Sequence, residues 1–443
     1  MAGFFHRDLQ HQNTLTMATS FDSLSYPTVV IIGGGFAGLR LAKHLNNKKF
    51  KVYLLDKNNY HTFQPLLYQV ATGGLGSDAI AYPFRKMIGP MPNVSFRMAA
   101  VQSIDDENSR VITDVGNFAY DYLVLATGAV TNFFGNASIK QWSMPIKTIP
   151  QSLDIRSELL QEFEKAMAAT TIADKQRILN FTIVGAGPTG VELAGAMAEI
   201  KKTVLPNDYP ELDPNLMSIH LVEAGSRVLA AMSESASEAA AKFLQEMGVH
   251  VILNTAVQEF DGHTLKLSNG STTSTETVLW SAGVMGNVVE GAKNAQVVRS
   301  RYKVNTHNQV EGYQNIFAVG DVAYMETKDY PKGHPQVAPV AMQQADLLAK
   351  NLHNITQKKA LKPFIYFDKG SMATIGRHKA VVDLPYFKFK GWFAWYVWMF
   401  VHLLMLIGFR NRFVVLLNWI WSYFSFQRAI RLIIRPYKKE PVQ

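Results

Sequence analysis

Two glycine-rich segments of this sequence have the residue types and spacing that hold a pyrophosphate group. Gly33, Gly35 and Gly38 follow one short apolar run, and three glycines with comparable spacing follow another, within residues 185–190. A Cβ at the first or second glycine would block the turn or the phosphates, and the helix that follows offers unpaired N–H groups. We therefore predict two dinucleotide sites, which suggests a flavin that passes electrons on and a nicotinamide that supplies them.

Each glycine turn is followed by an acidic residue that could bind a ribose. Asp56 lies 23 residues after Gly33, which is the spacing of a ribose-binding carboxylate. Glu223 lies 38 residues after Gly185, so its assignment rests on looser spacing, and an ordinary solvated glutamate is the alternative. A carboxylate at this position repels a 2′-phosphate, which predicts NADH rather than NADPH, although Arg227 leaves some use of NADPH open.

The elements that must position these residues are the strands and helices of two parallel sheets. The predicted strands are short apolar runs, at 28–32, 51–55, 122–126, 181–184, 218–222, 278–282 and 316–319. Ligands of such sheets lie at the carboxyl ends of the strands, where we find Ala126, Thr127, Gly128, Gly283, Gly320 and Asp321. The predicted fold class is α/β, with two Rossmann-like dinucleotide-binding domains and a C-terminal membrane-associated helical segment.

The order of these patterns predicts a discontinuous arrangement of domains. We expect a flexible lead-in at 1–25, an FAD-binding domain at 26–150 and 296–383, an NADH-binding domain at 151–295, and a membrane-anchoring tail at 384–443. The 443 residues contain no cysteine. This excludes disulfide redox centres, thiolate metal sites and a flavin attached through cysteine, and we predict no metal site.

The tail carries nearly all of the net charge of +9, because residues 384–443 hold nine basic residues and a single acidic one. That concentration does not favour a general nucleic-acid surface and indicates a separate partner for the tail. The uncharged runs 391–409 and 413–427 contain Trp392, Trp395 and Trp398 at helical spacing. We favour helices that lie in the interface over an anionic membrane surface, with a spanning segment or a buried dimer interface as alternatives.

Several longer motifs resemble those of the type II NADH dehydrogenases, the single-subunit NADH:quinone oxidoreductases of respiratory membranes. They are the segments 56–61, 64–73, 320–321 and 341–344, and the resemblance runs from about Pro27 to the tail. Together with the turns, it implies that FAD, bound non-covalently, contacts Gly33, Gly35, Phe36, Ala37, Gly38, Asp56, Lys57, Gln69, Thr72, Ala126, Thr127, Gly128, Gly320 and Asp321. NADH would contact Gly185, Gly187, Pro188, Thr189, Gly190, Glu223 and Gly283.

The resemblance also implies residues that act on the substrates. Glu192 matches a carboxylate between nicotinamide and flavin, although a glutamate in a first helical turn is also favoured by the helix dipole. Gln343 and Gln344 match part of the quinone motif, or form an ordinary polar helix face. Pro339 replaces a glutamine of that motif and should leave the helix intact. Lys379 matches a lysine near the same site, and a solvated lysine is the equal alternative.

We therefore predict a membrane-associated flavoenzyme that transfers electrons from NADH through FAD to a membrane quinone of the ubiquinone or menaquinone class. No charged path across a bilayer is visible, so proton pumping is not implied. The expected location is the cytoplasmic face of the inner membrane, and a homodimer stays open. A ferredoxin or rubredoxin reductase and a redox-sensing binding protein are the rivals, whereas sulfide:quinone and disulfide reductases need cysteines.

Overall fold

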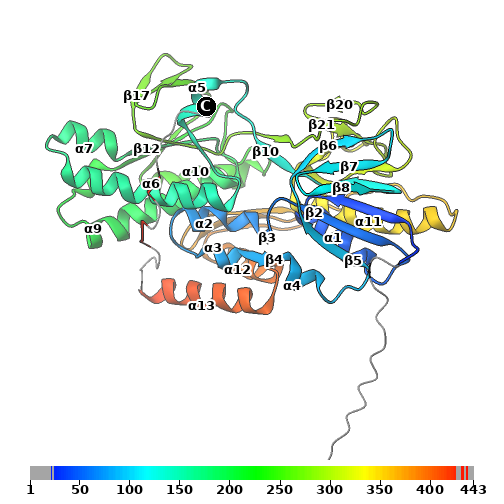
Figure 1. The fold of residues 1–443 in the computed structure, drawn as a ribbon. Helices are drawn as coiled ribbons and strands as arrows, with labels where there is room; N and C mark the ends of the chain where they lie inside the picture. The colour runs from blue at the N-terminus through cyan, green and yellow to red at the C-terminus, as the bar shows by residue number, and fades with distance from the viewer. Residues whose placement is uncertain (1–20, 22–23, 426–430, 434–435, 438–443) are drawn as a thin grey trace, which may run out of the picture.

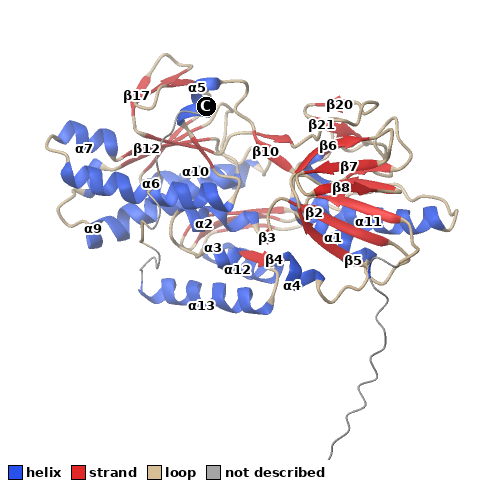
Figure 2. Ribbon diagram, in the orientation of Figure 1, coloured by secondary structure: helices blue, strands red, loops and turns tan. Residues whose placement is uncertain are grey.

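Two α/β lobes lie side by side in the computed structural model, with two C-terminal helices along their lower edge (Figure 1). The structure describes Phe21 and residues 24–425, 431–433 and 436–437. Most of the predicted lead-in and the last basic residues of the tail lie outside the described residues. The strands gather in two groups, one in each lobe (Figure 2).

The first lobe contains a five-stranded parallel sheet in the order β22-β9-β1-β2-β5. Its strands are buried apolar runs, as expected for a sheet that is covered on both faces. They are β1 (Thr28–Ile32), β2 (Lys51–Asp56), β5 (Val94–Met98), β9 (Tyr122–Leu125) and β22 (Ile316–Ala318). Because Ile316 of β22 pairs with Leu123 of β9, 193 positions earlier, the chain leaves this sheet and returns to it. Helices α1 (Phe36–Leu45) and α11 (Ala338–Thr356) pack together against it.

The second lobe contains another parallel sheet, in the order β11-β18-β12-β13-β14. These strands are β11 (Met144–Pro145), β12 (Asn180–Val184), β13 (Ser218–Val222), β14 (Val249–Ile252) and β18 (Thr277–Trp280). Its main helices are α6 (Ile149–Ala168), α8 (Pro188–Glu199) and α10 (Glu234–Glu246). A π-helical turn, η3 (Ile200–Val204), extends α8.

Smaller elements complete and connect the lobes. An antiparallel pair, β10 (Ala129–Thr131) with β19 (Val284–Gly286), runs between the lobes. Further strands are β3 (Tyr60–Thr62), β4 (Ala81–Pro83), β6 (Val101–Asp105), β7 (Arg110–Thr113), β8 (Gly116–Ala119), β15 (Val257–Phe260), β16 (Thr264–Leu267), β17 (Thr272–Ser274), β20 (Val297–Val298), β21 (Arg301–Lys303) and β23 (Ala323–Tyr324). Short helices are α2 (Leu67–Ala71), α3 (Ser77–Ile80), α4 (Phe84–Ile88), α5 (Ala137–Trp142), α7 (Ile172–Ile178) and α9 (Leu205–Asp208).

The C-terminal part contains a three-stranded sheet and two helices. They are β24 (Ser371–Gly376), β25 (Lys379–Asp383), β26 (Lys388–Lys390), α12 (Trp392–Met405) and α13 (Phe409–Ser425). The two helices are separated at Gly408, whose positive φ of 86° suits a glycine. No helix among the described residues is long and apolar enough to cross a membrane.

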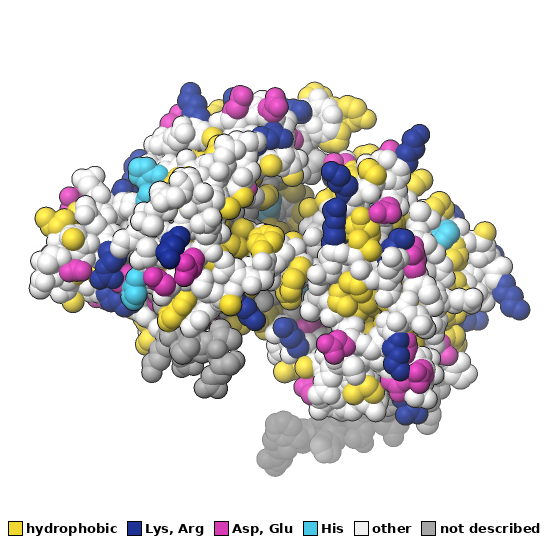
Figure 3. Space-filling model, turned by 90° about the horizontal axis from the view of Figure 1, so that it is seen from above, with side chains coloured by type: hydrophobic (Ala, Val, Ile, Leu, Met, Phe, Trp, Pro, Cys, Tyr) yellow, Lys and Arg dark blue, Asp and Glu magenta, His cyan; other side chains and the backbone are white. Residues whose placement is uncertain are grey.

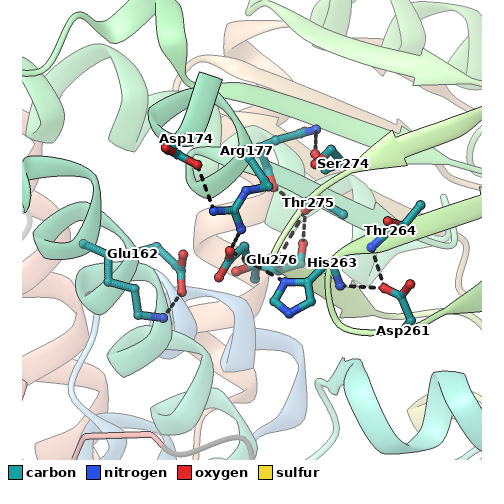
Figure 4. A network of polar contacts seen from close by, with 12 residues as sticks. Glu162, Asp174, Arg177, Asp261, His263, Thr264, Ser274, Thr275 and Glu276 are labelled. Carbon is teal, nitrogen blue, oxygen red and sulfur yellow. Dashed lines mark hydrogen bonds and ion pairs between the residues drawn. The ribbon is translucent and has the colours of Figure 1, made fainter. Parts of the chain in front are cut away.

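A polar network at the outer edge of the second lobe is structural (Figure 4). Arg177 of α7 forms ion pairs with Asp174 and with Glu276, which precedes β18. His263 lies 3.7 Å from Glu276, and the Thr275 hydroxyl donates to the backbone carbonyl of Asn180. These contacts tie α7 to the strands beside it, and none of these residues belongs to the site described next.

Candidate functional site

The first glycine turn connects β1 to α1 and is held by Asp56. The carboxylate accepts hydrogen bonds from the Gly34 N–H at 2.7 Å and from the Asn58 N–H at 2.8 Å. Gly33 has a φ of 101°, and a Cβ there would lie 2.4 Å from the Ala126 carbonyl oxygen, so only glycine fits. The predicted turn, its acid and the end of β9 are therefore brought together.

The second turn repeats this arrangement between β12 and α8. Glu223 accepts from the Ala186 N–H and from the Gly225 N–H, both at 2.7 Å. Gly185 has a φ of 97°, and a Cβ there would lie 2.7 Å from Ala282. Glu223 therefore holds its turn in the same way as Asp56 holds the first, although its spacing in the sequence is looser. Pro188 begins α8, where a proline needs no partner for its nitrogen.

The space around the middle glycine of each turn shows whether a dinucleotide fits. Gly35 has a φ of −68° and Gly187 a φ of −71°, which any residue can adopt. A Cβ at either position would meet no atom within 4 Å. Neither strain nor packing therefore requires glycine, and both positions leave open space at the start of a helix. A pyrophosphate fits there, close to the backbone N–H groups.

The third part of the predicted flavin site lies where β22 meets α11. The Gly320 N–H donates to the side-chain oxygen of Gln344 at 2.7 Å. Asp321 follows it, and burial raises the pKa of its carboxyl, while the charges of Lys147 and Arg301 oppose part of that shift. Helix α11 begins at Ala338 with Pro339 in its first turn, so the prediction that proline leaves this helix intact is confirmed.

The remaining predicted flavin contacts have mixed surroundings. Thr72 is buried, and its hydroxyl donates to the Tyr68 carbonyl at 2.8 Å. Phe36 packs edge-on against His61, whereas Lys57 is exposed. Thr127 donates to the Asn287 carbonyl at 2.5 Å, just after β19. Viewed from the side opposite α13, the surface is hollowed between the lobes, and hydrophobic side chains lie in its depth (Figure 3).

Three predicted site residues meet at one cavity of about 500 Å³, which lies between α8, the β24–β25 hairpin and the tail helices. Gln69, Glu192 and Lys379 all line it. Its other lining residues were not predicted as site residues; they are Tyr68, Gly74, Ala196, Ala198, Glu199, Lys202, Thr203, Glu246, Met247, Thr374, Gly376, Arg377, His378, Trp395, Trp398, Met399 and Trp419. The helical spacing of the tail tryptophans was the one available signal for its aromatic wall.

Glu192 is the most deeply buried acid of this cavity. Burial raises the pKa of its carboxyl well above the usual value, and the nearby Thr374 backbone and Trp398 indole oppose only part of that shift. The carboxyl therefore keeps its proton to a higher pH than a solvated glutamate. Helix α8 can bring Glu192 here because Gly195, one turn later, lets β24 approach closely: a Cβ would lie 1.8 Å from the Ile375 carbonyl oxygen.

The charged groups at the polar end of the cavity include one ion pair and one glutamate that is bound by a backbone N–H. Lys379 forms an ion pair with Glu246 at 2.7 Å, and its ammonium lies 5.4 Å from the centre of the Phe243 ring. Glu199 accepts a hydrogen bond at 2.5 Å from the Arg377 N–H in the turn before β25. Lys379 is therefore not just a solvated lysine, because its side chain is paired with Glu246 at the cavity wall.

The structure gives Gln343 and Gln344 backbone partners instead of a place in this cavity. Gln343 donates to the Phe367 carbonyl at 2.9 Å and accepts from the Phe367 N–H at 3.0 Å. Gln344 is 1% exposed and holds the Gly320 turn. Neither residue lines the cavity. The pair is thus more than a polar helix face, because each amide fixes a neighbouring segment of the chain.

The apolar end of the cavity is built by the tail. Trp398 of α12 is 1% exposed, and its ring stacks on His402 at 4.0 Å between centroids. Burial lowers the pKa of His402 to about 4, so this ring is neutral near pH 7. Trp419 of α13 lies 6.0 Å from Trp398 and donates its indole N–H to the Gln69 side-chain oxygen at 2.9 Å.

Comparison with known proteins matches both the lobes and the tail. A family model described as pyridine nucleotide-disulphide oxidoreductase matches residues 27–345, and one described as NDH2 C-terminal domain matches residues 369–428. The type II NADH:quinone oxidoreductase Ndh of Mycobacterium tuberculosis is 35% identical in an alignment of 420 residues that covers 90% of this chain and 89% of that protein. The type II NADH:quinone oxidoreductase of Haemophilus influenzae is 30% identical over 390 residues, covering 80% and 86%.

A solved structure supports the fold. The structure of NDH2 from Plasmodium falciparum in complex with NADH superposes with a TM-score of 0.85 over 92% of this chain and 100% of that one, at 23% identity. Because 92% of this chain is covered, the likeness extends into the C-terminal part that begins at Ser371.

Proposed function

This chain belongs to the type II NADH:quinone oxidoreductases, and from that membership we propose where FAD, NADH and the quinone bind in it. The enzyme oxidises NADH and reduces a quinone, with FAD as its flavin. The two rival functions, a ferredoxin or rubredoxin reductase and a sensor without turnover, are thereby set aside. FAD, when bound, accepts a hydride from NADH and passes two electrons to the quinone.

We assign FAD to the first glycine turn and NADH to the second. Open space at Gly35 and Gly187 supports both assignments, because each leaves room for phosphates against a helix N-terminus. Asp56 and Glu223 each hold their own turn and stand at the strand end where an adenosine ribose would bind. Asp321, at the end of β22, is assigned to the ribityl chain of FAD.

The quinone is assigned to the cavity lined by Gln69, Glu192 and Lys379. The single observation that carries this assignment is the combination of an aromatic wall, supplied by the tail, with a few polar groups at the other end. A quinone needs both, since its ring and isoprenoid chain are apolar and its carbonyl oxygens accept hydrogen bonds. We therefore place it here, in preference to a site at Gln343 and Gln344, whose amides already serve the backbone.

A photoreactive azidoquinone tests this assignment. Irradiation with the enzyme should label peptides that contain Trp395, Trp398 or Trp419, and an excess of unmodified quinone should prevent the labelling. Label in the α11 peptide around Gln343, with none in the tail, would place the quinone elsewhere. Steady-state oxidation of NADH with and without a short-chain quinone establishes beforehand that the preparation is active.

We further propose that the outer face of α12 and α13 contacts an anionic membrane surface. Large apolar side chains are exposed along it, among them Phe400, Leu404, Phe413, Leu417 and Ile420. Lys388, Lys390, Arg410 and Arg412 border this face and are exposed. Basic residues beside an apolar helix face favour anionic headgroups over a second copy of a chain that carries the same charges. The cytoplasmic leaflet, which is rich in anionic lipid, is the surface that this charge fits.

A further inference from the structure

A chain of hydrogen bonds connects the tail to the cavity through Gln69. The Trp419 indole N–H donates to Oε1 of Gln69 at 2.9 Å, and Nε2 of Gln69 donates to the Tyr68 hydroxyl at 2.9 Å. All three side chains line the cavity. The Gln69 backbone is fixed as well, because its carbonyl accepts from the Gly74 N–H at 2.7 Å and from the Leu75 N–H at 3.1 Å.

The chemistry of the indole decides the orientation of the amide. An indole N–H can only donate, so the atom of Gln69 that faces Trp419 must be the oxygen. The NH₂ group is then forced to the other side, where one of its two hydrogens goes to the Tyr68 hydroxyl. Without Trp419, the amide could turn over and present its oxygen to the cavity. The orientation therefore depends on a residue of α13, 350 positions further along the chain.

We propose that Gln69 donates the second N–H of this amide to a carbonyl oxygen of the quinone, and that Trp419 is the positioning residue that keeps Gln69 a donor. The proposal rests on the proposed quinone site. Quinone carbonyls only accept hydrogen bonds, so an amide turned the wrong way would face the substrate with a second acceptor. The tail thus sets the hydrogen-bonding polarity of the quinone site, in addition to forming its wall.

The rings around Trp419 show why this contact is well defined. Trp398 packs against Tyr68 at 6.5 Å and against Trp419 at 6.0 Å between centroids. The indole of Trp419 therefore has one aromatic neighbour that fixes its plane and one amide that receives its N–H. Replacement by phenylalanine removes the donor and keeps an aromatic ring in the wall.

The test compares Trp419→Phe with Trp421→Phe in the full-length, FAD-containing enzyme. Trp421 lies on the same helix, is 64% exposed and does not line the cavity. For Trp419→Phe we expect the KM for a short-chain quinone to rise about three- to tenfold, since roughly one hydrogen bond is lost on average. The rate at which NADH bleaches the flavin without quinone should stay unchanged, and Trp421→Phe should match the wild type in both measurements.

Gln69→Glu tests the donor role separately, since a carboxylate still accepts from Trp419 but, when ionised, cannot donate to the quinone. Its KM for quinone should rise at least as much as that of Trp419→Phe, and adding Trp419→Phe to it should have little further effect. An unchanged KM in Trp419→Phe, or an equal rise in Trp421→Phe, would overturn the positioning role. An unchanged KM in Gln69→Glu would overturn the donor role. If the azidoquinone labels another part of the wild-type chain, the proposed site itself has failed, which is a different result.

Discussion

At the scale of single residues, the glycines of the two turns have different physical roles. Gly33 and Gly185 are required by their positive φ values, whereas Gly35 and Gly187 have ordinary backbone angles and open space around them. The first pair serves the fold and the second pair leaves room for a ligand. A substitution at Gly35 or Gly187 should therefore weaken ligand binding and leave the fold intact.

Alanine at Gly35 or Gly187 should separate the two dinucleotide sites. Compared as apoproteins, the variants should fold with unfolding free energies within about 1 kcal/mol of the wild type, because the entropy that alanine removes from the unfolded chain opposes its poorer fit at a helix N-cap. Gly35→Ala should be purified with little FAD, measured by absorbance at 450 nm per mole of protein. Gly187→Ala should retain FAD and show a KM for NADH at least about tenfold higher. Full FAD content in Gly35→Ala would contradict the assignment of the first turn.

The raised pKa of Glu192 predicts a stability that depends on pH. The unfolded carboxyl ionises above about pH 4.5, while the buried one stays protonated to a higher pH. The folded state then binds more protons, so the free energy of unfolding falls as pH rises between the two pKa values, by up to about 1.4 kcal/mol per pH unit. Glu192→Gln removes this loss, so its stability relative to the wild type should increase with pH above 4.5.

Urea unfolding of Glu192→Gln and wild type from pH 4 to pH 8 measures this difference. Glu246→Gln is the matched control from the same cavity, because Lys379 lowers the pKa of the Glu246 carboxyl. That contribution to stability is complete above about pH 4.5 and is lost only as pH falls below it, so the control difference should stay flat over nearly all of this range. Parallel curves for Glu192→Gln and wild type would show that the carboxyl ionises normally in the folded enzyme.

At the scale of elements, the sequence was sufficient to predict those strands and helices that depend on local patterns of residues. The predicted strands at 28–32 and 218–222 coincide with β1 and β13, because short apolar runs bounded by glycine or charged residues define them. Pro339 is a local signal for the start of helix α11, which begins at Ala338, whereas its polar end at Thr356 has no such signal. The two uncharged runs of the tail became two helices separated at Gly408.

The parts of the site that could not be predicted depend on contacts between distant segments. Nothing in the sequence near Gln344 shows that its amide faces the Gly320 turn, and nothing near Trp398 distinguishes this buried tryptophan from the exposed Trp392. The π-helical turn η3, which brings Lys202 and Thr203 to the cavity, also has no local signal. Such features follow from packing across the sheet and the tail, which periodicity does not report.

Gly195 is an element-scale contact that allows a direct prediction. It lies within α8, where glycine weakens a helix, yet a Cβ would overlap the Ile375 carbonyl of β24. Gly195→Ala should therefore lower the free energy of unfolding by about 1–3 kcal/mol in spite of the better helix propensity. Chemical unfolding measures this change. Gly248→Ala is not a suitable control, because Gly248 has a positive φ and alanine would be strained there. A stabilised Gly195→Ala variant would show that α8 and β24 are further apart than the structure places them.

At the scale of the whole molecule, the tail contributes to the cavity, to an exposed apolar surface and to a cluster of basic residues. The inner faces of α12 and α13 close the cavity, their outer faces expose apolar side chains, and basic residues lie at their ends. If the outer face contacts a membrane as proposed, a quinone dissolved in that membrane reaches the cavity from the same side of the enzyme. Attachment and catalysis should nevertheless be separable, because the basic residues of the tail, Lys388, Lys390, Arg410 and Arg412, do not line the cavity.

Neutralising the exposed basic residues should weaken binding to anionic membranes and leave the chemistry intact. Each Lys or Arg near such a surface contributes about 1 kcal/mol, so the triple variant Lys388→Gln, Lys390→Gln and Arg410→Gln should bind vesicles containing one-third anionic lipid roughly a hundredfold more weakly. Binding to neutral vesicles should stay the same, since the apolar face is untouched and does not depend on charge. Reduction of a water-soluble quinone in detergent should also be unchanged.

Vesicle flotation over a range of lipid concentrations measures this effect, and the control variant neutralises Lys140, Lys242 and Lys328, which are exposed on the lobes. Both triple variants lose the same charge, so a general effect of net charge would weaken both equally. If the tail surface is the contact, only the tail variant weakens, and 1 M salt brings the wild type down to its level because screening removes the same interaction. Equal losses in the two variants would mean that the field of the whole enzyme attracts the membrane, and that the tail contributes only its apolar face.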